Sequence, residues 1–146
     1  MRRRHFPPER NVIPAHLTLF HHLAPDLAAE LRQRLSAETR RIAPPPASIA
    51  GLIELGRGVA YRIDSPALAA IRARLADAFA PMLTPQDRAG WRPHVTIQNK
   101  VAPVEARALR EALAEDFRPR PIVIAGLACW WYRDGPWEPL SRHMFG

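Results

Sequence analysis

A four-residue pattern that occurs twice constrains the fold of this chain more than any other feature. Histidine, apolar residue, threonine, apolar residue is found at 16–19 (HLTL) and again at 94–97 (HVTI), 78 residues later. Alternate side chains of a β-strand share a face, so each histidine would lie about 6–7 Å from its threonine while the apolar residues enter the core. If the two halves are related by an approximate twofold axis, the two strands lie side by side.

Such a pair of strands predicts a site made of His16, Thr18, His94 and Thr96. Cleavage or transfer of a phosphodiester needs one group to accept a proton and another to donate one, and two imidazoles do both near neutral pH. Threonine hydroxyls can donate to the phosphate oxygens as negative charge develops there. The competing interpretation is that these four residues only form the polar faces of amphipathic strands.

The rest of the chain alternates between helical and extended patterns, which predicts an α+β fold. Apolar residues at spacings of three and four predict helices, each delimited by proline, over 25–41, 65–79 and 103–117. β-Branched or alternating runs predict strands at 16–20, 49–55, 59–64, 94–100 and 121–132. Gly56 and Gly58 favour a hairpin turn, and the segment 84–93 is expected to be a loop.

Length and composition indicate one globular domain over 1–146. The chain has 47% hydrophobic and 24% charged residues, and no apolar run approaches the roughly 18–20 residues of a membrane helix. Without a visible secretory signal, a cytoplasmic location and no membrane partner are expected. The single cysteine, Cys129, excludes an intramolecular disulfide and a cysteine zinc cluster, and we expect it to be buried.

The charge balance is basic. There are 21 basic and 14 acidic residues, a net charge of +7, and every basic residue except Lys100 is an arginine. Arginine suits two-pronged contacts with phosphate, so a polyanionic partner such as RNA is compatible with this surface. A compositional bias that replaces lysine by arginine on solvated faces explains the same numbers equally well.

Several segments resemble the two-histidine phosphoesterase superfamily, which includes bacterial 2'-5' RNA ligase and the cyclic nucleotide phosphodiesterases. The resemblance is carried by both histidine motifs, by PAHLTLF at 14–20, by GRGVA at 56–60, by TPQD at 84–87 and by WRPHVTIQNK at 91–100. It implies two lobes of antiparallel sheet with outer helices around a central cleft, a pseudo-twofold repeat, and a catalytic set of His16, Thr18, His94 and Thr96. It also implies RNA ends or nucleotide-like phosphoesters as substrates.

The chain departs from that family at two places. Some members carry an arginine three residues after the motif threonine, where this chain has His21 and Asn99. Lys100, in strand register with His94, is a candidate for the missing positive charge. The family's first strand is expected to be absent, because only a short stretch broken by two prolines precedes the first motif.

Two further residues are candidate substrate contacts: Arg62, on the strand face opposite Tyr61, and Tyr132, in an aromatic cluster that could stack on a base. No metal site and no cofactor are expected, since His16 and His22 would be about 20 Å apart in an extended strand. The sequence therefore predicts a metal-independent enzyme that opens 2',3'-cyclic phosphates or makes and breaks 2'-5' bonds. The alternative is a module that binds RNA ends or a phosphorylated metabolite without turnover.

Overall fold

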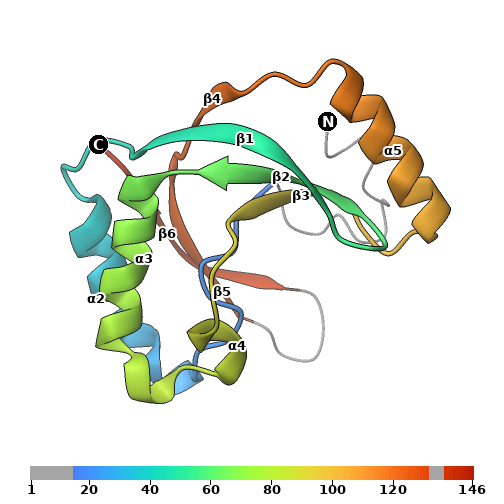
Figure 1. The fold of residues 1–146 in the computed structure, drawn as a ribbon. Coiled ribbons are helices and arrows are strands. Elements are labelled where there is room, and N and C mark those ends of the chain that lie inside the picture. Colours follow the sequence, from blue (N-terminus) through green and yellow to red (C-terminus); the bar gives the residue numbers. More distant parts are fainter. Residues whose placement is uncertain (1–14, 132–136) are drawn as a thin grey trace. The chain divides into compact units, whose positions relative to one another are not determined.

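A computed structural model describes residues 15–131 and 137–146 (Figure 1). The chain forms two compact units, each assembled from separate segments. Of the described residues, the first unit contains 15–18, Ser48–Asp64 and Arg92–Pro121, and the second contains Leu19–Ala47, Ser65–Trp91, 122–131 and 137–146. The expectation of a single domain over 1–146 stays a prediction.

A four-stranded sheet forms the centre of the first unit. Its order is β3-β2-β1-β4, with β1 at Pro46–Glu54, β2 at Val59–Asp64, β3 at His94–Gln98 and β4 at Arg120–Val123. The β1–β2 and β2–β3 pairs are antiparallel, as the expected hairpin requires, and Gly56 takes a positive φ of 80° in the β1–β2 turn. A positive φ is nearly free for glycine, so this turn closes without strain.

The helix α5 (Pro103–Glu115) packs against β2 of this sheet. α5 contacts β2, and its Ala106 is fully buried. The Tyr61 ring of β2 has the centre of the Phe117 ring 6.4 Å from its own centre and the guanidinium carbon of Arg120 at 5.1 Å. The Tyr61 face is therefore the core face of the sheet in this unit.

In the second unit a helix packs on a two-stranded sheet. β5 (Gly126–Trp131) and β6 (Glu138–Met144) are antiparallel, and α2 (Ala28–Thr39) contacts both. α3 (Pro66–Ala78) begins at an N-cap serine, Ser65, whose hydroxyl accepts from the Leu68 amide at 3.2 Å. The remaining elements are short: η2 (Pro25–Leu27), η3 (Ala80–Met82) and α4 (Pro85–Arg88).

The α+β class and the three long helices are confirmed, but several strand predictions need correction. Residues 16–20 do not form a strand and contribute only one isolated bridge, at Leu17. The strand expected at 94–100 ends at Gln98, and the one expected at 121–132 is divided between β4 and β5, which belong to different sheets. α4 and β6 were not expected.

Three expectations about the fold stay predictions: the two lobes around a cleft, the pseudo-twofold repeat and the missing first strand. The last of these falls on residues 1–14, outside the described part of the chain. Cys129 is buried as expected, and burial raises the pKa of its thiol. Among the described residues no helix has the length and apolarity needed to cross a bilayer.

Candidate functional site

The two histidine motifs lie side by side in the first unit. Leu17 of the first motif forms an antiparallel bridge with Val95 of the second, on β3. Continuing this register by one residue in each direction places His16 opposite Thr96 and Thr18 opposite His94. The bridge therefore brings the two motifs next to each other in antiparallel order.

Strand alternation places the His94 and Thr96 side chains on one face of β3. Val95 is opposite Tyr61 on β2, so Leu17 and Val95 share the core face of the sheet. His94 and Thr96, the neighbours of Val95 on β3, then lie on the other face. His16 is exposed, and Thr18, His94 and Thr96 are half-buried, so solvent and a ligand can reach the cluster.

The His94 ring has a defined tautomer. Its Nδ1 lies 2.7 Å from the carbonyl oxygen of Arg92, and because a carbonyl can only accept, Nδ1 carries the hydrogen and donates. In the neutral imidazole Nε2 is then the free base, and in the protonated ring Nε2 becomes an acid. The same carbonyl holds the ring orientation in both states.

Arg62 shares the polar face of the sheet. It pairs directly with His94 on β3 and with Gly51 on β1. Its guanidinium lies across Gly51, where an added Cβ would be 3.1 Å from Nη2, and Nη2 donates to the Ala50 carbonyl at 3.0 Å. Because residue 51 is glycine, the exposed guanidinium has room to lie over β1, which β2 separates from the His94 strand β3.

The strand register does not extend to Lys100. The β2–β3 pairing shifts between Val59 and Ala60, and β3 ends at Gln98. Lys100 is exposed and takes a left-handed conformation with φ of 57°. The alternation that would put Lys100 beside His94 is broken, and a role for it in substrate binding stays a prediction. Tyr132 lies outside the described residues.

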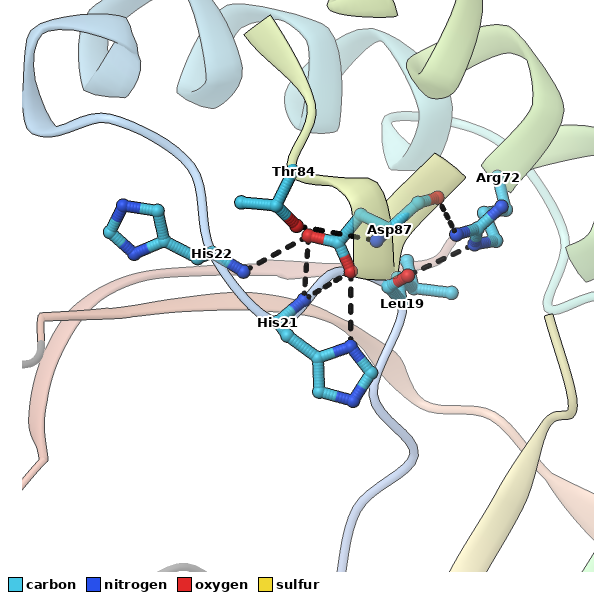
Figure 2. A network of polar contacts seen from close by, with 6 residues as sticks. All are labelled: Leu19, His21, His22, Arg72, Thr84 and Asp87. Atoms are coloured by element: carbon cyan, nitrogen blue, oxygen red, sulfur yellow. Dashed lines mark hydrogen bonds and ion pairs between the residues drawn. The ribbon is translucent and has the colours of Figure 1, made fainter. Parts of the chain in front are cut away.

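The sequence did not predict a polar network that lies in the second unit (Figure 2). Its centre is Asp87, whose side chain is 1% exposed and accepts from the amides of His21 and His22 and from the His21 ring. Burial alone would raise the pKa of Asp87, but these hydrogen bonds and the His21 charge outweigh it and lower the pKa. Asp87 is therefore an ionised carboxylate at neutral pH.

One sequence signal pointed toward this network. Thr84-Pro85-Gln86-Asp87 has the form of a helix N-terminus, and the Thr84 hydroxyl does accept from the Asp87 amide at 3.3 Å. The pattern predicts α4, which the loop interpretation missed. It does not predict that the Asp87 carboxylate binds a segment 66 residues earlier in the chain.

No group of three or more histidine, cysteine, aspartate or glutamate side chains in the described ranges 15–131 and 137–146 is arranged to hold a metal ion. The polar cluster of the first unit consists instead of two imidazoles and two hydroxyls on neighbouring segments.

An antiparallel α+β protein with paired histidine and threonine motifs is the class that the fold and this cluster define. Residues 1–136 match the 2'-5' RNA ligase superfamily, and the chain belongs to that family. Membership makes it an enzyme of the phosphoesterase or ligase kind, which acts on RNA or phosphoester substrates. A search of curated proteins found no match to the chain.

Proposed function

We propose that this protein is a metal-independent phosphoesterase that opens 2',3'-cyclic phosphates or makes and breaks 2'-5' phosphodiester bonds. The observation that supports the proposal is the Leu17–Val95 bridge, because it brings the two histidine and threonine motifs next to each other. Acid–base catalysis at phosphorus needs this combination of two imidazoles and nearby hydroxyl donors.

The proposed hydrolysis assigns one role to each residue. Neutral His94 takes a proton at Nε2 from the attacking water, whose oxygen forms a bond to phosphorus. Protonated His16 gives its proton to the ribose oxygen as the bond from that oxygen to phosphorus breaks, and the product is a phosphomonoester. Thr18 and Thr96 donate to the non-bridging oxygens. In ligation a 5'-hydroxyl replaces water, and in the reverse reaction the two histidines exchange roles.

The direct test is a panel of 2',3'-cyclic nucleotides and 2'-5'-linked oligonucleotides, assayed with and without a chelator. We expect turnover of at least one class at an unchanged rate in chelator, since the proposed proton transfers use only imidazoles. Product analysis separates hydrolysis from ligation. Complete loss of activity in chelator, restored by zinc or manganese, would contradict the mechanism, and tight binding without product would favour the non-catalytic module.

Arg62 is proposed to attract the substrate phosphate rather than to take part in proton transfer. Arg62→Gln is expected to raise KM about tenfold with kcat nearly unchanged, because a charge-assisted hydrogen bond is worth about 1.5–3 kcal/mol and this site is solvated. Arg110→Gln, which removes the same charge at an exposed position of α5, is the matched control and should leave KM as in the wild type. If the two substitutions raise KM by the same factor, Arg62 contributes to substrate binding only through the net charge of the protein.

A further inference from the structure

A basic groove of the second unit is lined by side chains of α2 and β6. Its volume is about 350 Å³, and its lining residues are Ala29, Arg32, Gln33, Ser36 and His143. Four of these side chains can donate hydrogen bonds, and none of the five is acidic. A groove of this size and composition suits a small anionic ligand.

The four α2 residues of the groove share one face of the helix. Their positions, 29, 32, 33 and 36, follow the spacing i, i+3, i+4, i+7 of neighbouring side chains. That spacing normally carries the apolar stripe of a surface helix, whereas here it carries an arginine, a glutamine and a serine. The buried residues of α2 are Leu35 and Thr39, so the polar stripe remains at the surface.

The positive charge of Arg32 is not matched by an acidic side chain. Both glutamates of α2 pair with other arginines: Glu30 with Arg34 at 2.9 Å, and Glu38 with Arg74 at 2.8 Å. In the ranges 15–131 and 137–146 no ion pair includes Arg32. An unmatched guanidinium beside a groove attracts an anion from solution.

His143 adds a second group that can carry a positive charge. Its Nε2 lies 3.0 Å from the Ser141 hydroxyl, and partial burial and the Arg32 charge both lower the pKa of its ring. Cys129 of β5 is opposite Ser141, and its thiol is neutral at neutral pH because burial raises the pKa of the thiol. An anion in the groove would offset the Arg32 charge and favour the protonated imidazole.

We propose that this groove is a binding site for a phosphate dianion, either free phosphate or the phosphate group of a small phosphomonoester. The Arg32 guanidinium can bind two phosphate oxygens in a two-pronged contact. The Gln33 amide, the Ser36 hydroxyl and the protonated His143 ring supply further donors. A phosphate has enough acceptor oxygens for all of these groups, whereas a carboxylate has only two. The site is independent of the proposed function, because its residues take no part in the proposed proton transfers.

The test is an NMR titration of the full chain with inorganic phosphate, compared with chloride at equal ionic strength. We expect saturable shifts of the His143 ring and of the Gln33 and Ser36 amides, with a Kd of about 1–10 mM for a site open to solvent. The pKa of His143 should rise in phosphate, since the anion stabilises the imidazolium. Shifts that do not saturate, or a His143 pKa that phosphate leaves unchanged, would overturn the proposal.

Three variants test which groups hold the anion. Arg32→Gln should weaken phosphate binding at least about tenfold, the effect of losing a charge-assisted contact. Arg40→Gln, which removes the same charge at the exposed C-cap of α2, is the matched control and should bind like the wild type. Ser36→Ala keeps the charge and favours the helix, and should weaken binding about 2- to 10-fold. If both arginine variants weaken binding equally, the groove responds only to net charge and is not a site.

Two further titrations distinguish the sources of the phosphate group. Adenosine 5'-monophosphate should shift the same signals: binding tighter than that of inorganic phosphate identifies a phosphomonoester as the occupant, and equal affinity identifies free phosphate. Adenosine should leave the His143 ring unchanged, and a saturable shift with adenosine would contradict recognition of the phosphate. These results do not depend on turnover, so they stand whether or not the two histidine motifs are catalytic.

Discussion

Replacing either motif histidine by alanine is expected to lower turnover at least about 100-fold, the usual cost of removing a positioned acid or base. Substrate affinity should fall far less, because the threonines and Arg62 still contact the phosphate in the proposed mechanism. The double variant should be little worse than either single one, since the two imidazoles act as one unit. His22→Ala, which removes an exposed histidine side chain of the second unit, is the control.

The pH dependence gives a second measure of the same mechanism. One imidazole must be neutral and the other protonated, so kcat/KM should follow a bell-shaped curve with one limb for each. Thr18→Val and Thr96→Val should keep the bell and lower its height, because the hydroxyls stabilise charge without transferring the proton. Wild-type turnover in either histidine variant would refute the acid–base assignment and favour a binding module.

Gly58→Ala is expected to lower the free energy of unfolding by about 2–3 kcal/mol, the largest stability effect that we predict. A Cβ at this position would lie 2.0 Å from the Gln98 carbonyl oxygen and 2.9 Å from Asn99 Cα. Both are backbone atoms that cannot rotate away, so the β1–β2 turn would have to separate from the end of β3. Urea unfolding followed by circular dichroism measures the loss.

Two glycines serve as matched controls for that substitution. An added Cβ at Gly90 would have no atom within 4 Å and the φ of this residue is not positive, so Gly90→Ala should be neutral or slightly stabilising. Gly56 is equally open but has a φ of 80°, so Gly56→Ala should cost about 1 kcal/mol from backbone conformation alone. If Gly58→Ala costs no more than Gly56→Ala, the close approach to Gln98 is not a constraint.

The elements that the sequence predicted well are those with a local cause. Proline and an N-cap serine mark the start of α3, and its apolar spacing selects the face that buries Leu68, Ile71 and Leu75. Gly56 and Gly58 predict the hairpin turn between β1 and β2. Where pairing depends on distant segments, the prediction was wrong: the run at 121–132 divides because its first part pairs in the four-stranded sheet and its second part pairs with β6.

The candidate site shows the same division. Two copies of a histidine and threonine pattern, in strand-like surroundings, were enough to name His16, Thr18, His94 and Thr96 and to expect them side by side. The alternation in HLTLF also predicted a strand at 16–20, but alternation reports which face a residue prefers and not whether a partner strand continues beside it. Among residues 16–20, Leu17 alone forms a β-bridge, with Val95.

The sequence by itself determined the helical segments and the hairpin turn and supplied the candidate groups of the site, because spacing, proline, glycine and residue type act over a few neighbouring positions. Only the tertiary structure decided that Leu17 pairs with Val95, that Arg62 lies opposite His94, and that Asp87 binds the amides of His21 and His22. The reason is physical: a backbone amide is the same donor in every residue, so nothing in the local sequence marks which buried carboxylate it will meet.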